Sequence, residues 1–193
     1  MAKPYEIKLI ENYQFDEVAS ALQKAVRRNE EYLACYWAFI IHESGFYKYL
    51  WRRLLIIASE DIGNATPNAA QLVHSLQASY HYAITSVNRS KNDSLCFVFQ
   101  AVIFLCRADK TRETDSLVNL IRTRFEQGER LAVPAYAKDF HTRSGRAKLG
   151  NWQDGTDADV AERHRLWFDE YSRVEPDMGD KYLDDLKKVK GVQ

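Results

Sequence analysis

Apolar side chains recur every three or four residues through the first two thirds of the chain, the spacing typical of amphipathic α-helices. In the first such segment, Val18, Leu22 and Ala25 fall on one face. The spacing and the intervening polar turns predict helices over residues 16–28, 31–44, 46–61, 67–87 and 114–126. Thr66-Pro67 is typical of a helix start, because threonine can cap a helix and proline fits its first position.

The apolar run over residues 95–106, LCFVFQAVIFLC, fits two kinds of element. Its aromatic and β-branched residues are typical of a buried strand. Its length and the helical patterns on both sides favour a buried central helix instead. The run is too short to span a bilayer, so we expect no membrane segment.

The pattern changes after residue 130. Pro134, Gly145, Gly150, Gly155 and Pro176 divide the sequence into shorter segments. Residues 147–159 resemble a long loop, and helices are predicted over 158–173 and 180–189. We therefore expect an all-α protein with a helical domain at 1–130 and a less regular C-terminal extension at 131–193.

The charge balance and the cysteine content of the chain limit the functions that it can be expected to have. The chain has 193 residues and a formal net charge of zero, so bulk charge does not indicate nucleic-acid binding, although a local basic patch can still bind it. The three cysteines are an odd number among apolar neighbours, which indicates buried free thiols in a reducing compartment. The N-terminus has no signal-peptide pattern, so we expect a cytoplasmic protein.

Sequence motifs for catalysis are missing from this chain. It has no Walker A pattern, no glycine-rich dinucleotide loop, no Cys-x2-Cys pair and no His-Glu-x-x-His. His74 and His81 lie two helical turns apart, too far to share a metal without a third ligand. We expect no enzyme, no cofactor and no metal.

The segment 50–67, LWRRLLIIASEDIGNATP, is the most distinctive. Arg52 and Arg53 precede an acidic helix end, which is formed by Ser59, Glu60 and Asp61. Gly63 follows two residues later. Carboxylates are unfavourable at a helix C-terminus, so we expect a partner, either the two guanidinium groups or a neighbouring helix N-terminus. The alternative is a solvated helix end that happens to be acidic.

A basic segment lies at residues 135–150, AYAKDFHTRSGRAKLG. It combines hydroxyls and a flexible glycine with the candidate DNA-binding residues Lys138, His141, Arg143, Arg146 and Lys148. Positive side chains and accessible backbone N–H groups are what phosphate binding requires. Two other interpretations of this segment remain. It is either a plain surface loop or an acid–base pair formed by Asp139 and His141.

Aromatic residues are concentrated in the second and third predicted helices. These aromatic residues are Tyr32, Tyr36, Trp37, Phe46, Tyr47, Tyr49 and Trp51. Their distribution over the helix faces favours a role in the core and in a subunit interface over stacking on nucleic-acid bases.

Four segments carry a family resemblance: SALQKAVRR at 20–28, CYW at 35–37, RRLLIIASEDIGNATPNA at 52–69 and QAVIFLCRADK at 100–110. Together they resemble the C-terminal helical domain of the RarA/MgsA family of AAA+ ATPases, which includes the Werner-helicase-interacting protein. The ASEDIG core at 58–63 is the most specific part. The resemblance implies a helical bundle related to the clamp-loader collar, tetramer assembly, and association with DNA and single-strand-binding protein at stalled forks.

The sequence also departs from this family. It begins where the ATPase module would have ended, DKTRE at 109–113 replaces the usual lysine-serine-asparagine turn, and the final third matches poorly. The segment VPAYAKDFHTRSGRAKLG at 133–150 resembles instead a pattern of stand-alone relatives of this domain.

These observations give one leading hypothesis and two alternatives. The first is a non-catalytic helical module of DNA replication, recombination and repair that forms a dimer or tetramer. In it, Glu60 and Asp61 fix helix ends, and the basic loop contacts DNA. The second is an adaptor that binds a separate AAA+ ATPase or single-strand-binding protein without touching DNA. The third is an enzyme that uses Asp139 and His141.

Overall fold

The computed structural model describes residues 6–85, 91–151, 154–175 and 186–188. The chain divides into two compact units, residues 1–128 and 129–193, and each is described by itself. The described residues form helices and no strand, apart from an isolated bridge between Lys8 and Gln14. The all-α fold class predicted from the sequence is therefore confirmed.

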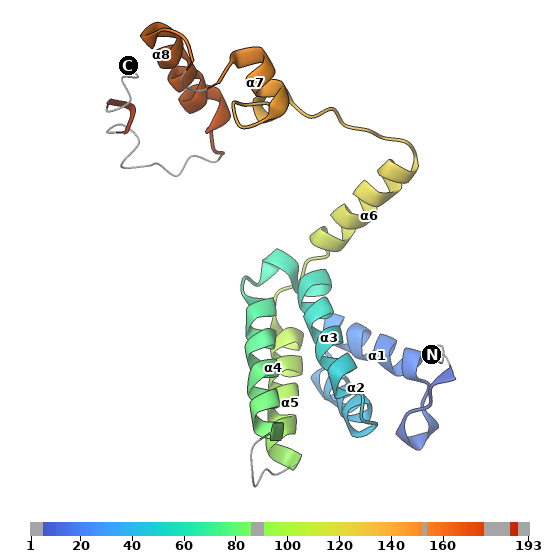
Figure 1. Ribbon diagram of the computed structural model, residues 1–193. Coiled ribbons are helices and arrows are strands. Elements are labelled where there is room, and N and C mark those ends of the chain that lie inside the picture. The colour runs from blue at the N-terminus through green and yellow to red at the C-terminus, as the bar shows by residue number, and fades with distance from the viewer. Residues whose placement is uncertain (1–5, 86–90, 152–153, 176–185, 189–193) are drawn as a thin grey trace. The chain divides into compact units, whose positions relative to one another are not determined.

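The first unit is a bundle of helices, shown in blue to yellow in Figure 1. Its α-helices are α1 (Phe15–Arg27), α2 (Glu31–Glu43), α3 (Tyr47–Ile57), α4 (Ala69–Thr85), α5 (Lys91–Arg107) and α6 (Glu113–Glu126). Helix α5 packs mainly against α4 and α2 and also contacts α1 and α3. The ambiguous run at 95–106 lies within α5, so the central helix is confirmed and the buried strand is wrong.

The core of the first unit forms where the apolar stripes of its helices meet. Leu54 and Ile57 of α3 and Val102 and Leu105 of α5 are fully buried. Burying a side chain of this size stabilises the fold by roughly 1.5–3 kcal/mol. The aromatic cluster is split between core and surface, since Trp51 is fully buried whereas Tyr32 is exposed.

The segment between α3 and α4 departs from the sequence prediction. Helix α3 continues into a π-helical turn, η3 (Ala58–Ile62), and a short 3-10 turn, η4 (Gly63–Ala65). Helix α4 begins only at Ala69, and Thr66 Oγ1 donates to the carbonyl oxygen of Asp109 at 3.2 Å. The predicted helix start at Pro67 is therefore two residues too early, because Thr66 contacts a distant segment instead of capping the helix.

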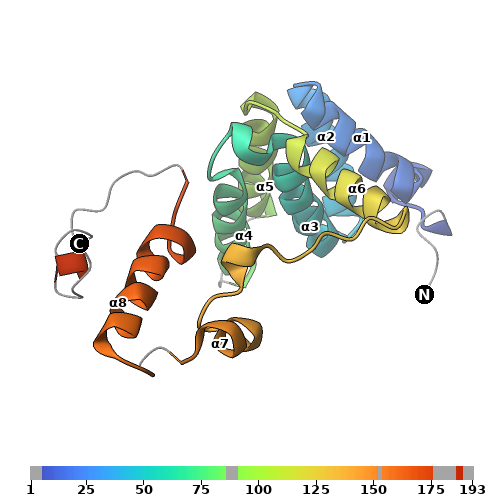
Figure 2. The same ribbon diagram turned by 90° about the horizontal axis from the view of Figure 1, so that it is seen from above.

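The second unit contains η5 (Ala135–Ala137), α7 (Arg143–Leu149), α8 (Asp157–Leu166) and the π-helical η6 (Trp167–Tyr171), shown in orange to red in Figure 2. Thr156 caps α8 through a reciprocal pair of bonds with Asp159. The predicted loop at 147–159 is too long at both ends, because α7 reaches Leu149 and α8 starts at Asp157. Of the predicted helix at 180–189, residues 186–188 are helical and the others lie outside the described residues.

Within the described parts of the chain, no helix combines the length and the apolar character needed to cross a membrane.

Candidate assembly and nucleic-acid interfaces

The acidic turn after α3 is organised around a buried carboxylate. Asp61 is 0% exposed. Its Oδ1 accepts a hydrogen bond from Arg27 Nε at 2.7 Å, and its Oδ2 accepts one from Gln23 Nε2 at 2.8 Å. Arg112 Nε lies 3.6 Å from Oδ1. A charge removed from water needs such partners, so Asp61 ties α1 to the end of α3 and to the segment that precedes α6.

Glu60 lies at the edge of the same cluster. Its Oε1 is 3.5 Å from Arg112 Nη2 and 4.0 Å from Arg27 Nη2. The guanidinium groups that hold the acidic turn are thus those of Arg27 and Arg112. Sequence reasoning missed both, because they lie far from the turn along the chain.

Arg52 and Arg53, the partners expected from the sequence, have other contacts. Arg53 donates to the hydroxyl oxygen of Tyr49 at 2.9 Å and to Gln23 Oε1 at 3.3 Å. The Arg52 guanidinium carbon lies 5.5 Å from the centroid of the Tyr49 ring. The expectation of direct pairing with Glu60 and Asp61 is therefore wrong. Arg53 reaches the cluster only through Gln23.

Gly63 closes the turn against the segment that leads into α6. Its φ of +52° lies in the left-handed region, which side chains rarely adopt. A Cβ there would lie 3.2 Å from Thr111 Cγ2 and 3.4 Å from Thr114 Oγ1. The glycine therefore allows a close approach between the acidic turn and the start of α6. Ser59 is exposed beside it.

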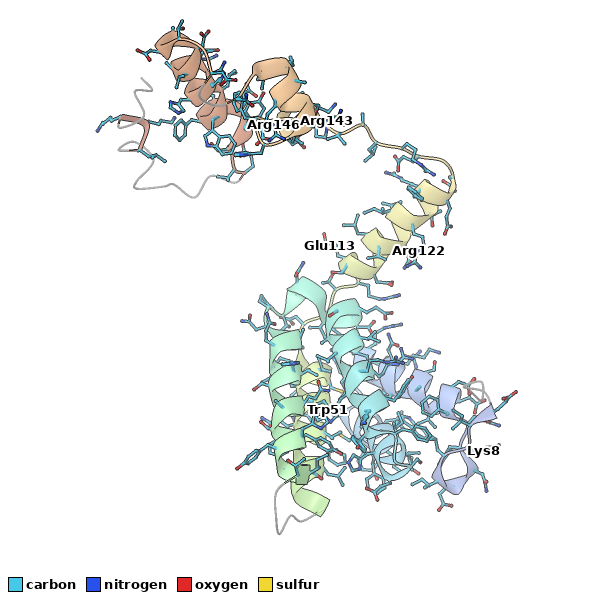
Figure 3. The ribbon with its side chains drawn as sticks, viewed as in Figure 1. Lys8, Trp51, Glu113, Arg122, Arg143 and Arg146 are labelled. Carbon is cyan, nitrogen blue, oxygen red and sulfur yellow. The ribbon has the colours of Figure 1, made fainter. Side chains whose placement is uncertain are left out.

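Helix α6 carries an apolar face that the bundle does not cover. Five large apolar residues of α6 are between 46 and 60% exposed: Leu117, Val118, Leu120, Ile121 and Phe125. Figure 3 shows α6, with Glu113 and Arg122 labelled, standing clear of the helices around Trp51. A shallow cavity of about 380 Å³ lies at its base, lined by Leu55 and Ile56 of α3 and by Val118.

The basic segment of the second unit is a tight turn that leads into α7. Asp139 Oδ1 accepts a hydrogen bond from the backbone N–H of His141 at 3.0 Å. Thr142 Oγ1 accepts from the Gly145 N–H at 3.0 Å and donates to the Asp139 carbonyl at 2.9 Å. A Cβ on Gly145 would lie 1.7 Å from that carbonyl oxygen, so only glycine fits. These bonds fix the backbone on which the cations are carried.

Four side chains give this turn its positive charge: Lys138, Arg143, Arg146 and Lys148. All four are exposed, and in the described part of the chain none forms an ion pair. Arg146 donates to the carbonyl oxygen of His141 at 3.2 Å. The His141 ring meets Trp167 edge-on, with the ring centroids 5.3 Å apart. The turn thus carries four cationic side chains at the surface of the second unit.

Asp139 and His141 do not form an acid–base pair in this structure. The carboxylate bonds to the backbone of His141, whereas the imidazole contacts Trp167. Among the described residues, no group of three or more His, Cys, Asp or Glu side chains could hold a metal ion.

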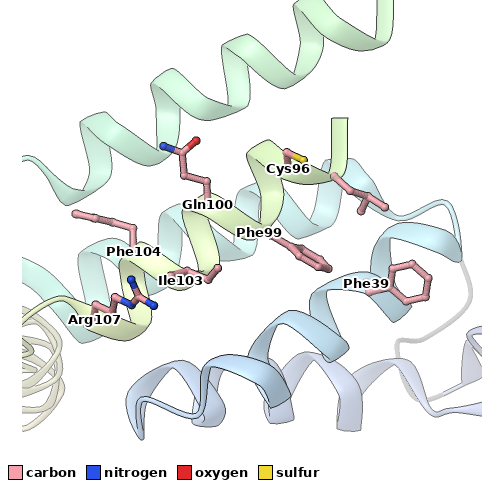
Figure 4. Close-up of a pocket in the computed structure, with 8 residues that line it drawn as sticks. Phe39, Cys96, Phe99, Gln100, Ile103, Phe104 and Arg107 are labelled. Atoms are coloured by element: carbon pink, nitrogen blue, oxygen red, sulfur yellow. The ribbon is translucent and has the colours of Figure 1, made fainter. Parts of the chain in front are cut away.

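A second apolar surface lies between α2 and α5. Figure 4 shows Phe99 of α5 and Phe39 of α2 beside a cavity of about 800 Å³, which Ile103 also lines. At its edge, Arg107 makes two hydrogen bonds to Glu31, at 2.7 and 3.0 Å, and these lower the pKa of the Glu31 carboxyl. The lining is mostly apolar, with Cys96, Gln100 and Arg107 as its polar members.

The all-α bundle with its acidic turn is the fold class that a C-terminal helical domain of AAA+ ATPases requires. Residues 31–158 match the family described as MgsA AAA+ ATPase C terminal, and the chain belongs to that family. The match begins after the segment 20–28 and extends through α7, so it includes the whole basic turn.

Curated relatives support this assignment. The chain is 33% identical over 138 residues to replication-associated recombination protein A of Escherichia coli K12, with 70% of this chain and 28% of that protein covered. It is 28% identical over 177 residues to ATPase WRNIP1 of Dictyostelium discoideum, with 88% of this chain and 19% of that protein covered. The chain is also 28% identical over 139 residues to replication-associated recombination protein A of Bacillus subtilis, with 72% of this chain and 31% of that protein covered. The chain thus spans about a third or less of the length of these relatives.

Proposed function

We propose that this chain is a non-catalytic helical module of the DNA replication, recombination and repair machinery. It assembles with copies of itself through α6 and contacts DNA phosphates through residues 138–148. The observation that carries the DNA contact is the fixed turn with four exposed cations, none of which forms an ion pair with another described residue. The match to a family with relatives named replication-associated recombination proteins supports the cellular setting.

The apolar face of α6 supports self-assembly. Leu117, Ile121 and Phe125 are spaced four residues apart, so the stripe is symmetric about Ile121. In an antiparallel pair centred there, Phe125 of each copy meets Leu117 and Val118 of the other, beside the cavity at the base of α6. Apolar burial favours such a pair by roughly 25 cal/mol per Å². A formal net charge of zero does not oppose it.

Sedimentation velocity over a range of protein concentrations tests the assembly. We expect Ile121→Asp to shift the protein to monomer, because the substitution places a charge at the centre of the apolar face. Thr123→Asp, on the polar face of the same helix, is the control and should leave the assembly unchanged. A wild-type protein that stays monomeric at every concentration would refute self-assembly.

Gel retardation across a salt series tests the DNA contact. Phosphate contacts release counterions, so replacing both Arg143 and Arg146 by alanine should weaken binding to any sequence and reduce the salt slope by about 2. Arg173→Ala is the matched control, because Arg173 is exposed in the same unit but already paired with Glu175. No retardation of DNA by the wild type at low salt would refute this part of the proposal.

The apolar surface between α2 and α5 favours a second candidate, an adaptor that binds an AAA+ ATPase or single-strand-binding protein without DNA contact. Titration with purified single-strand-binding protein separates the two. If the chain is such an adaptor, it should bind single-strand-binding protein. The substitution Phe99→Asp in the chain should abolish that binding, and Arg143→Ala should leave it intact.

A further inference from the structure

Helix α6 leaves the bundle with few attachments. Its main contacts with other helical elements are with η3 and η4, the turns that follow α3. A helix held only at its first turn would swing, and its apolar face would then point in many directions. Something at its base must therefore fix its direction if the face is to meet a partner.

Three kinds of contact join the base of α6 to the acidic turn: a backbone hydrogen bond, a close approach at a glycine, and ion pairs. The backbone N–H of Thr111 donates to the carbonyl oxygen of Asp61 at 3.1 Å. Gly63 lets Thr111 and Thr114 approach closely. Arg112, the residue just before α6, bridges Asp61 and Glu60 on one side and Asp115 in the first turn of α6 on the other.

We infer that Asp61 and Arg112 are positioning residues that fix the direction in which α6 leaves the bundle. Asp61 is itself held on α1 by Arg27 and Gln23, so one buried carboxylate joins α1 to the end of α3 and, through Arg112, to the first turn of α6. The guanidinium group of Arg112 hydrogen-bonds to Asp115 and lies 3.5 Å from a Glu60 oxygen and 3.6 Å from an Asp61 oxygen, so one planar cation lies near three carboxylates. The consequence of this inference for self-assembly rests on the proposed function of α6 as the assembly helix.

Arg112 is the informative residue to change. Its side chain is 47% exposed, and Asp61 keeps Arg27 and Gln23 when Arg112 is removed. Arg112→Gln should therefore release α6 without unfolding the bundle. Arg122→Gln is the matched control, because Arg122 is exposed on the same helix and makes no ion pair among the described residues.

Electron–electron double resonance measures the direction of α6 in the full chain. Nitroxides are attached at Lys48→Cys on α3 and Thr123→Cys on α6, in a background with Cys35→Ala and Cys96→Ser. Labelled chains are diluted with unlabelled ones, so that only distances within one chain are recorded. Circular dichroism checks that each variant melts cooperatively.

We expect a single narrow distance peak in the parent and in Arg122→Gln, and loss of that peak in Arg112→Gln. An equally narrow peak in Arg112→Gln, or no narrow peak in the parent, would overturn the inference. Sedimentation of Arg112→Gln then tests the consequence, which is weaker association although the apolar face is intact. If the wild type is monomeric, the proposed assembly fails, while the distance measurement still decides the role of Arg112.

Discussion

Asp61 is a charged residue with no access to water, and its environment has to offset the cost of that burial. The cost of desolvating a carboxylate is several kcal/mol, and attraction to a single guanidinium group rarely exceeds it. Asp61 accepts a short hydrogen bond from Arg27 and another from the side-chain amide of Gln23, and a second guanidinium group, that of Arg112, lies nearby. The residue is therefore a point where neutralising the charge should have a large effect.

Asp61→Asn should lower the free energy of unfolding by about 2–3 kcal/mol, because it leaves the Arg27 guanidinium group without its buried partner. Arg27 is about a third exposed, and water moderates the loss. Glu60→Gln, at the solvent edge of the same cluster, should cost about 1 kcal/mol or less. Urea unfolding followed by circular dichroism compares the two, and equal losses would contradict a central role for Asp61.

The candidate site could be predicted from sequence only in part. The acidic turn was expected to need a cationic partner, since carboxylates are unfavourable at a helix end. Which cations supply it depends on how α1 and the segment before α6 pack against the turn. No local pattern in the sequence encodes that packing, so Arg27 and Arg112 were not foreseen.

The three cysteines offer a second test at this scale. Burial raises the pKa of the Cys106 thiol to about 11, with a further contribution from nearby Cys35, whose own pKa burial also raises. Cys96 is exposed. Since the thiolate is the nucleophile, iodoacetamide at pH 8 should modify Cys96 first and Cys106 last.

Mass spectrometry of timed samples gives the order of modification. Protein unfolded in guanidinium chloride is the control and should react at all three positions at similar rates. Fast alkylation of Cys106 in the folded protein would contradict its burial.

At the scale of elements, the sequence predicted the long helices well and the short or irregular ones poorly. The spacing of apolar residues predicts the ends of α1 and α2 to within about two residues, because one face of each helix packs against the core. Helix α7 lies across a predicted loop boundary, since a seven-residue helix has too few turns to show a period. Its start is fixed by the close backbone approach between Gly145 and Asp139, a contact within the preceding turn that the spacing of apolar residues does not reveal.

Gly145→Ala should therefore disrupt the second unit selectively. Its Cβ would collide with the carbonyl oxygen of Asp139, which is backbone and cannot move aside cheaply. Ser144→Ala, at an exposed neighbouring position, is the control. In amide ¹H–¹⁵N spectra we expect large changes for residues 138–149 in the glycine variant and little change for α1–α5. Unperturbed 138–149 signals would show that the turn tolerates a side chain.

At the scale of the whole molecule, the two units are stabilised very differently. The contiguous apolar core lies within the first unit and draws on α1 to α5. In the described part of the second unit, Phe140 is the one buried apolar side chain, and it packs edge-on against Tyr171. Because burial of apolar surface dominates folding stability, the first unit should account for most of the cooperative unfolding signal.

A fragment of residues 1–128 should consequently fold alone and melt within a few degrees of the full chain, since it keeps every residue of the core cluster. It should also associate over the same concentration range as the full chain, because α6 and its attachment to Asp61 are retained. Retardation of DNA should be lost together with residues 138–148. Calorimetry, sedimentation and gel retardation on the same preparation separate these outcomes. A fragment that melts without cooperativity would show that the second unit contributes to the core. One that still retards DNA would place the phosphate contacts on the bundle instead of on the basic turn.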